Sequence, residues 1–393
     1  MALSPVRRLL LVVALLLAVL APGFFFLLPL EVAGRLNRTH APPPYRAADA
    51  ATALHGTLRL ADLHADSLLW ARDLASRSSR GHLDLPRLLE AGVTLQVFSA
   101  VTKTPRFLNF ERNDDSTDNI QALVFAQRWP RESWTSLTER ALYQARRLHA
   151  LAAASGDRLV VVKNRSDLAG LLGRHMLDEA VTGGLLAIEG MHALDGDPYA
   201  FAALHDAGYR IMGLAHFFDN ALGGSAHGVD KGGLTPLGRQ LIELMDQRGV
   251  IIDLAHASPR LIDEVLETST RPVIVSHTGV RGTCDRTRNL SDAQLLSIAA
   301  RGGLIGIAYF EEAVCGTDAD AVARAVAHAV STVGADHVAL GSDFDGAVAT
   351  PFDVTGLPLL TEALLEAGLR EDEIRRIMGD NVLEFLLTWL PDD

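Results

Sequence analysis

Three features are missing from this chain of 393 residues: a surplus of basic charge, an internal repeat, and a cysteine close to its apolar N-terminus. Lys and Arg number 36 against 48 Asp and Glu, giving a formal net charge of -12, and no basic patch follows the first residues. Because such a surface repels polyanions, no nucleic-acid partner is expected. The missing cysteine excludes a lipid attached to an N-terminal cysteine. With 48% hydrophobic residues, the chain is expected to fold as a globular protein.

A long apolar run near the N-terminus stands apart from the globular part. Arg7 and Arg8 precede residues 9–30, which carry no charged side chain. At about 1.5 Å per residue, this run spans roughly 30 Å as a helix, enough to cross the apolar core of a bilayer. We therefore expect residues 1–31 to form a signal-anchor, a transmembrane segment with its basic end in the cytoplasm and the rest of the chain outside.

A cleaved signal peptide is the alternative to the anchor. Pro22-Gly23 interrupts the apolar run, so cleavage near Ala21 would leave a secreted form. Residues 32–50, which include APPPY, are expected to be a Pro-rich spacer. The chain ends in TWLPDD without a hydrophobic tail, so we expect attachment through the N-terminus.

Residues 51–393 show an alternation of strand and helix patterns. Eight apolar, strand-like segments occur at roughly 58–63, 93–98, 185–189, 210–215, 249–255, 272–277, 303–309 and 337–342. Most are followed by a helical pattern, which indicates parallel βα units. The α/β pattern predicts a (β/α)8 TIM-like barrel of the metal-dependent hydrolase type. A long insertion of about 101–183 separates the second and third strands, and its LVVVKN segment is expected to add an outer strand.

The strongest candidates for metal ligands all follow predicted strands. They are His64, Asp66, Glu189, His216, His256, His277 and Asp343. In a parallel barrel the carboxyl ends of all strands meet at one face, so these side chains are expected to converge. Imidazoles and carboxylates converging at one mouth are typical of a metal hydrolase.

Five of these residues divide into two metal sites that share Glu189. His64 and Asp66 are two residues apart and point to the same side of a strand. His256 and His277 end consecutive strands, about 4.8 Å apart. We expect two Zn²⁺ ions per chain, bridged by Glu189 and holding a hydroxide between them; manganese or cobalt stays open. The alternatives are a Glu189 paired with a barrel cation and histidines that are merely buried in the core.

Other residues are expected to act on the substrate. Asp343 could take a proton from the nucleophile and pass it to the leaving amine, whereas Asp345 is expected to cap its loop. His216 is either a donor to a developing oxyanion or a structural imidazole. Arg286 and Arg288 both follow the strand of His277, and either could hold a substrate carboxylate.

Two expectations concern the remaining histidines and the cysteines. The other histidines are expected to face solvent for the most part, with His227 on a loop over the mouth. Cys284 and Cys315 both lie in the part expected to be exported, where an oxidising compartment permits a bridge; two buried free thiols are the alternative.

The chain resembles the membrane dipeptidase (renal dipeptidase) family of dinuclear zinc peptidases over nearly all of residues 55–390. The resemblance is carried by DLHADSL, AIEG, GLAHFFDN, HGVDKGGLTPLGRQLIELMDQRGVIIDLAHAS, VSHTGVRG, RNLSD, GSDFDG and IMGDNVLEFL. It implies dipeptide substrates and a metal pair held by the residues matching His64, Asp66, bridging Glu189, His256 and His277. It further implies that the matches of His216 and Arg288 bind substrate, that Asp343 acts in the active site, and that Cys284 and Cys315 form an intrachain bridge.

Two other functions remain as alternatives to a zinc-dependent dipeptidase. Another barrel amidohydrolase, such as a lactonase or deacetylase, would often use a carboxylated Lys as its metal bridge, but no Lys ends a predicted strand here. A catalytically inactive, membrane-tethered binding protein would lack a ligand or Asp343, yet all of these residues are present. A homodimer is left open.

Overall fold

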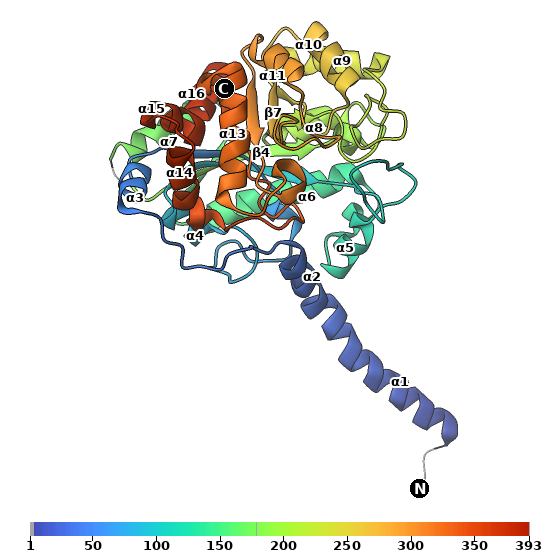
Figure 1. Ribbon diagram of the computed structural model, residues 1–393. Helices are drawn as coiled ribbons and strands as arrows, with labels where there is room; N and C mark the ends of the chain where they lie inside the picture. The colour runs from blue at the N-terminus through green and yellow to red at the C-terminus, as the bar shows by residue number, and fades with distance from the viewer. Residues whose placement is uncertain (1–3, 178, 393) are drawn as a thin grey trace.

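Eight parallel strands close into a barrel in the computed structural model, which describes residues 4–177 and 179–392 (Figure 1). The barrel strands are β1 (Leu60–Ala65), β2 (Val93–Val101), β4 (Thr182–Glu189), β5 (Tyr209–Gly213), β6 (Ile251–Asp253), β7 (Ile274–Thr278), β8 (Leu304–Ile307) and β9 (Val338–Leu340). Neighbouring strands pair in the order β2-β1-β9-β8-β7-β6-β5-β4, and the β2–β4 pairing closes the ring. The predicted (β/α)8 barrel is confirmed.

One further strand, β3 (Leu159–Val162), lies outside the ring. It pairs with the first half of β4, where Leu159 faces Thr182, while β5 pairs with the second half of the same edge. The segment between β2 and β4 also holds α5 (Ile120–Ala126), α6 (Leu137–Ala154) and α7 (Arg165–His175). The structure therefore contains the predicted insertion and its outer strand.

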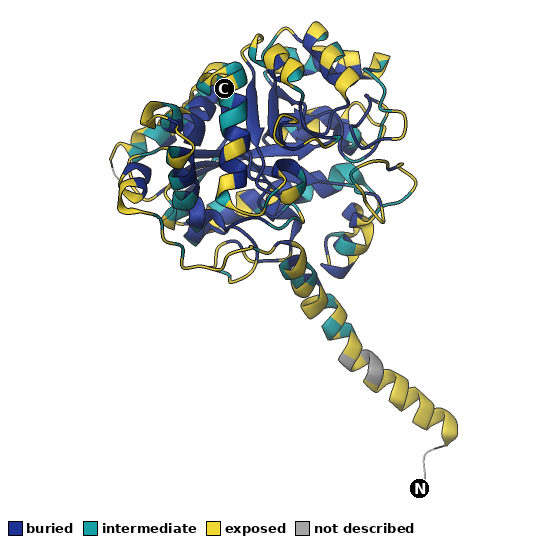
Figure 2. Ribbon diagram, viewed as in Figure 1, coloured by how far each residue is buried: buried dark blue, intermediate teal, exposed yellow. Residues whose placement is uncertain are grey.

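Helices cover the outside of the barrel and complete its core (Figure 2). The remaining helices of the globular part are α3 (Asp49–His55), α4 (Leu85–Glu90), α8 (Ala200–Asp206), α9 (Pro236–Arg248), α10 (Pro259–Thr268), α11 (Asp292–Ala299), α12 (Glu311–Val314), α13 (Ala319–Val333), α14 (Leu357–Glu366), α15 (Glu371–Arg375) and α16 (Asn381–Trp389). Side-chain caps define several starts, among them Thr235 on α9 and Ser258 on α10. Inside the ring, Leu95 and Ile211 join a cluster that also holds Val382 and Leu386 of α16, so this helix packs under the strand starts. The carboxyl ends of the strands, at the other end of the barrel, stay open.

The N-terminal residues form a helical rod that projects from the barrel (Figures 1 and 2). It consists of α1 (Pro5–Pro22), a π-helical turn η1 (Gly23–Leu27) and α2 (Leu28–Leu36). By length and composition, this helix of 32 residues could cross a membrane. At about 1.5 Å per residue, it is longer than a bilayer core requires. Its inner end, including part of the expected spacer, lies against the barrel.

Candidate metal centre

The seven candidate residues meet at the carboxyl ends of the barrel strands, and all are buried. They come from six different strands or the turns that follow them: His64 and Asp66 from β1, Glu189 from β4, His216 from β5, His256 from β6, His277 from β7 and Asp343 from β9. This convergence follows from the parallel barrel, because every strand presents its last residues to the same face.

Glu189 lies at the centre of the cluster and contacts four imidazoles. Its Oε1 is 2.8 Å from Nε2 of His256, 3.4 Å from Nε2 of His277 and 3.8 Å from Nε2 of His64. Its Oε2 is 3.2 Å from Nε2 of His216. One carboxylate therefore contacts imidazoles that come from both halves of the expected metal pair.

The ligand atoms fall into three overlapping groups, each within 4.8 Å. They are His64, Glu189 and His277; Glu189, His216 and His256; and His64, Asp66 and Asp343. Glu189 belongs to two of these groups and His64 to two. These groups differ from the two expected metal sites. They include His216 and Asp343, which are not among the five expected ligands.

Buried negative charge makes this cluster suitable for cations. Burial lowers the pKa of His64, but Asp66 and Glu189 outweigh this effect and raise it to about 10. Burial raises the pKa of Asp66 to about 7 and that of Asp343 well above its usual value. Nε2 of His64 and Oδ1 of Asp66 form no hydrogen bond within the described residues. Divalent ions would neutralise the carboxylates and satisfy these atoms.

The other imidazoles have the protonation state that metal binding requires. Burial lowers the pKa of His216, His256 and His277 well below the usual value, so all three are neutral. A neutral imidazole offers a lone pair to a metal. Oxygen and nitrogen donors of this kind fit Zn²⁺, and the cluster therefore fits the group that the sequence predicts.

His227, which is expected on a loop over the mouth, lies beside His256 and fixes its orientation. Nδ1 of His227 lies 2.7 Å from the carbonyl oxygen of Phe110, which can only accept, so Nδ1 carries the proton. Nε2 of His227 must then accept from Nδ1 of His256, 3.0 Å away. This arrangement leaves Nε2 of His256 with a free lone pair, directed at Glu189.

The expectation that most other histidines face solvent is wrong for His55 and His82. Both are buried, and so is His227, which is expected on a loop over the mouth. His82 receives the backbone N–H of Asp345 at Nδ1, and burial lowers the pKa of His192 to about 3. Turn-like surroundings in the sequence do not reveal such burial, because the covering elements lie far away along the chain.

We expect His227→Phe to lower the affinity for Zn²⁺ by about 10–100-fold, the usual effect of removing a partner that orients a ligand. Phe keeps the ring volume but cannot accept from His256. Zn²⁺ affinity would be measured by competition with a chromogenic chelator, with His328→Phe as control because His328 pairs with the distant Asp292. Equal affinity in all three proteins would show that His227 does not orient a ligand.

Arg288 lines the cavity above the cluster with two unused donors. Its Nη2 donates to the carbonyl oxygen of His277 at 3.2 Å, and its guanidinium lies 4.9 Å from the ring centroid of Phe310. Nε and Nη1 are buried and have no partner within the described residues. Arg286, by contrast, is exposed. The structure thus places Arg288, rather than Arg286, where a carboxylate could bind in the cavity.

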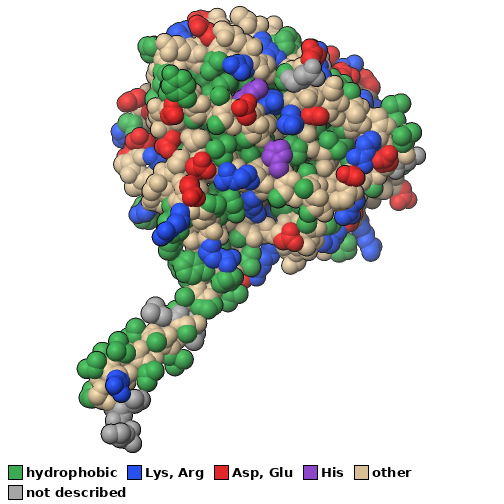
Figure 3. Space-filling model, turned by 180° about the vertical axis from the view of Figure 1, so that it is seen from behind, with side chains coloured by type: hydrophobic (Ala, Val, Ile, Leu, Met, Phe, Trp, Pro, Cys, Tyr) green, Lys and Arg blue, Asp and Glu red, His purple; other side chains and the backbone are tan. Residues whose placement is uncertain are grey.

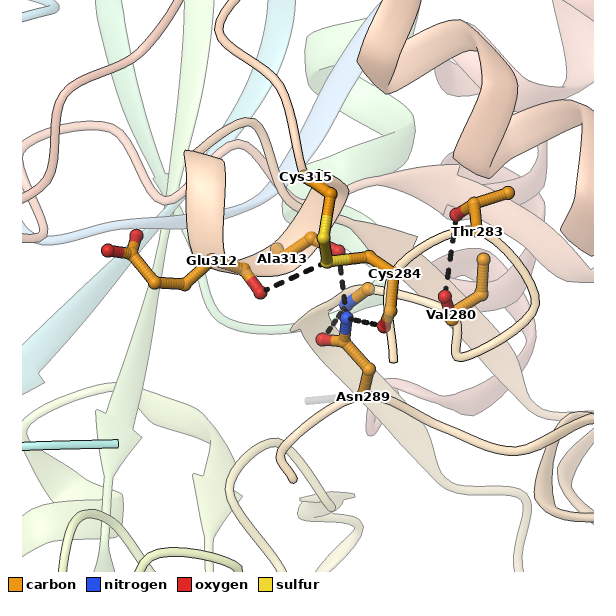
Figure 4. The surroundings of a disulfide bond; sticks show 8 residues. Val280, Thr283, Cys284, Asn289, Glu312, Ala313 and Cys315 are labelled. Carbon is orange, nitrogen blue, oxygen red and sulfur yellow. Dashed lines mark hydrogen bonds between the residues drawn. A yellow bond between two sulfur atoms is a disulfide. The ribbon is translucent and has the colours of Figure 1, made fainter. Parts of the chain in front are cut away.

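A disulfide holds the loop that carries Arg288 (Figure 4). It joins Cys284, after β7, to Cys315, directly after α12, so the prediction of a bridge is confirmed and the alternative of free thiols is wrong. Asn289 ties the same two segments together, because its Nδ2 donates to the carbonyl oxygens of Cys284 and Ala313 at 2.7 and 2.9 Å. Both restraints lie next to Arg288.

The two aspartates after β9 have different surroundings. Asp343 lines the cavity, and its Oδ1 is 3.8 Å from Nε2 of His64. Asp345 points away: it pairs with Arg72 and accepts from Oγ of Ser67 at 2.5 Å. Asp343 and His256 both have φ of 61°, a left-handed conformation that is uncommon for residues other than glycine. Strain of this kind concentrates at functional sites.

A parallel (β/α)8 barrel with histidines and carboxylates clustered at its open end defines a metal-dependent hydrolase barrel. The sequence model of the membrane dipeptidases (peptidase family M19) matches residues 48–388, and the chain belongs to this family. The predicted family is thereby confirmed.

Curated relatives match half or somewhat more of the chain, and about 30% of the matched residues are identical. An uncharacterized dipeptidase of Schizosaccharomyces pombe is 32% identical over 51% of the chain and 51% of its own length. The dipeptidase verJ of Clonostachys rogersoniana is 30% identical over 61% of the chain and 62% of its own length. The matched region thus spans between half and two thirds of these curated relatives.

Solved structures match the barrel over most of the chain. A metallopeptidase of Rhodobacter sphaeroides, liganded with a phosphinate mimic of the dipeptide L-Ala-D-Ala, superposes with a TM-score of 0.66 at 26% identity, covering 85% of this chain and 99% of that one. The probable dipeptidase PvdM of Pseudomonas aeruginosa gives 0.71 at 18% identity, covering 86% and 96%, and shows a shared fold.

Proposed function

We propose that the chain is a zinc-dependent dipeptidase that hydrolyses the single peptide bond of dipeptides. The observation that carries this proposal is the position of Arg288. Its buried guanidinium lines the same cavity as the metal cluster, and two of its donors have no partner among the residues that the structure describes. A guanidinium there can bind the free carboxylate of a short peptide whose bond lies over the cluster. The Rhodobacter relative, which holds a mimic of a dipeptide, supports this substrate class.

Five residues would hold two zinc ions: His64, Asp66 and Glu189 for one, and Glu189, His256 and His277 for the other. When bound, the ions would supply an activated water, a hydroxide shared between them, and polarise the carbonyl of the scissile bond. Glu189 would join the two sites, which its central position among the imidazoles supports.

Asp343 would move the proton. Burial raises the pKa of its carboxyl well above the usual value, so the side chain can keep a proton that it has taken up. It would accept a proton from the attacking water and deliver it to the leaving amine. His216, which contacts Glu189 and lines the cavity, would donate a hydrogen bond to the oxygen of the scissile carbonyl.

The N-terminal helix would anchor the enzyme in a membrane, with the barrel outside the cytoplasm. Support comes from its length and apolar composition and from Arg7 and Arg8 before the apolar run, which favour a cytoplasmic start. Cleavage near Ala21 would instead release the barrel together with α2.

The test of this function is the length and end group of the substrate. Dipeptides with a free carboxylate are expected to be hydrolysed, whereas C-terminally amidated dipeptides and tripeptides are not, because one residue of about 3.5 Å separates the scissile bond from Arg288. Arg288→Ala should raise KM for dipeptides. It should also narrow the difference in hydrolysis between dipeptides with a free carboxylate and C-terminally amidated dipeptides. Arg288→Lys should recover only part of the loss, since Lys cannot form the bidentate pair.

The exposed Arg286 provides the matched control, and Arg286→Ala should leave both KM and the preference for acids unchanged. The measurement is the release of free amino acids, followed over a range of substrate concentrations. Equal hydrolysis of amides and acids by the unaltered protein would refute the carboxylate contact, and with it the dipeptidase proposal.

A further inference from the structure

The cavity above the metal cluster, about 730 Å³ in volume, continues along the N-terminal helix. Phe24, Leu28, Val32 and Leu36 all line it. These residues are four apart, so they share one face of the helix. The neighbouring face, with Pro29 and Ala33, is buried. A segment predicted from its composition as an anchor thus also forms a wall of the catalytic cavity.

The barrel side of the cavity is apolar as well, and Val32 and Ala33 of the helix pack against it. This side consists of Leu69 and Trp70 after β1, Val101 at the end of β2, and Ile120 and Leu123 of α5, all of which line the cavity. We call the part of the cavity that these residues and the helix line the apolar annex. Cavities of about 300–1,000 Å³ hold drug-sized ligands. A dipeptide of small residues would leave the annex empty.

The helix wall is fixed to the barrel rather than loosely attached. Oδ1 of Asn37, the residue after α2, accepts from the backbone N–H of Ala347 at 2.8 Å, in the loop that carries Asp343. Glu31 pairs with Arg80, and the rings of Phe25 and Phe125 lie 5.5 Å apart. Contacts at both ends of the helix segment therefore hold it beside the catalytic loop.

Apolar side chains of this wall remain uncovered. Phe24 is 40% exposed and Leu28 is 45% exposed, although both lie where the helix meets the globular part. Figure 3 shows apolar side chains continuing from the projecting helix onto that part of the surface. An apolar group of a ligand in the cavity would contact the faces of these side chains that line it, and the hydrophobic effect would favour its binding.

The position of the annex around the barrel indicates which end of the substrate it receives. Arg288 follows β7, and β2 lies four strands from β7 in either direction around the ring. The annex residues Leu69, Val101 and Ile120 follow β1 and β2, on the far side of the metal cluster from Arg288. A dipeptide with its carboxylate on Arg288 would direct its amino-terminal residue to the annex.

We propose that the annex binds the side chain of the amino-terminal residue and that the N-terminal helix makes the enzyme prefer dipeptides with a long, linear apolar chain there. This inference rests on the proposed dipeptidase function. Leu28 and Val32 are its specificity-determining residues. A cleavage near Ala21 would leave both in place, so the annex does not depend on whether the anchor is retained.

The test uses the full chain in lipid nanodiscs and glycine dipeptides with amino-terminal alanine, norvaline, norleucine or 2-aminoheptanoic acid. We expect kcat/KM to rise by about three- to fourfold per added methylene, the ratio that corresponds to about 0.8 kcal/mol of burial. Leu28→Ser should lower kcat/KM for the longest substrate by about five- to tenfold more than kcat/KM for Ala-Gly.

Leu27→Ser is the matched control, because Leu27 is the adjacent residue, is exposed, and does not line the cavity. It should leave the whole series unchanged. If kcat/KM does not change with chain length while Ala-Gly is hydrolysed normally, the annex does not bind the amino-terminal side chain, and the dipeptidase function stays intact. Equal effects of Leu27→Ser and Leu28→Ser would lead to the same conclusion. Failure to cut Ala-Gly at all would instead reject the proposed function itself.

Discussion

Replacing Glu189 with Gln is expected to remove both metal ions together. Oε1 of Glu189 lies within 3.8 Å of imidazoles from His64, His256 and His277, which are expected to serve two different ions. Gln has nearly the same shape but lacks the charge, so neither ion would keep a shared anionic ligand. Purified wild-type protein should carry close to two zinc ions per chain by elemental analysis, and the variant well under one.

Glu311→Gln is the control, since Glu311 lines the same cavity but is exposed and belongs to none of the three ligand groups. It should keep both ions. The two variants also separate a bridging role from a general loss of negative potential near the site. Two tightly bound ions in Glu189→Gln would contradict the bridging assignment, and loss of only one ion would assign Glu189 to a single site.

The sequence predicted the barrel because the signal for it is local and repeated. Each barrel strand is buried along its length, so most of its residues are apolar, as in β8 with the sequence LIGI. Polar residues at the ends of such runs, such as Glu189 and His277, are costly to bury without a partner. The parallel topology then brings them to one face, so their convergence could be predicted from the order of strands.

The orienting contacts could not be predicted in this way, because they join segments far apart in the chain. His227 contacts the carbonyl of Phe110, 117 residues away, and Asn37 contacts Ala347, 310 residues away. Neither residue belongs to a periodic pattern or a strand end. The N-terminal helix raised a related difficulty: its composition predicts a membrane span, but only tertiary packing shows that Phe24 and Leu28 also line the cavity.

Asp343→Asn is expected to lower turnover by about 10²–10⁴, the range for a residue that transfers protons, while zinc content and thermal stability stay near those of the wild type. Asn has the same shape but cannot accept and release a proton. Dipeptide hydrolysis would be measured on zinc-loaded protein, together with elemental analysis. Asp343 also lies in a ligand group with His64 and Asp66. Loss of an ion from Asp343→Asn would therefore reassign it as a ligand.

Gly346 offers a second test of Asp343 that leaves its carboxylate chemically intact. A Cβ at Gly346 would lie 1.9 Å from Oδ1 of Asp343, so Gly346→Ala must displace the carboxylate. If catalysis depends on the position of the Asp343 carboxylate as well as on its charge, this variant should lose much of its turnover and keep its zinc. Gly170→Ala, on α7 with open space around it, is the control. Turnover within a fewfold of wild type in both Asp343→Asn and Gly346→Ala would show that Asp343 is structural, and proton transfer would then depend on another group of the cavity.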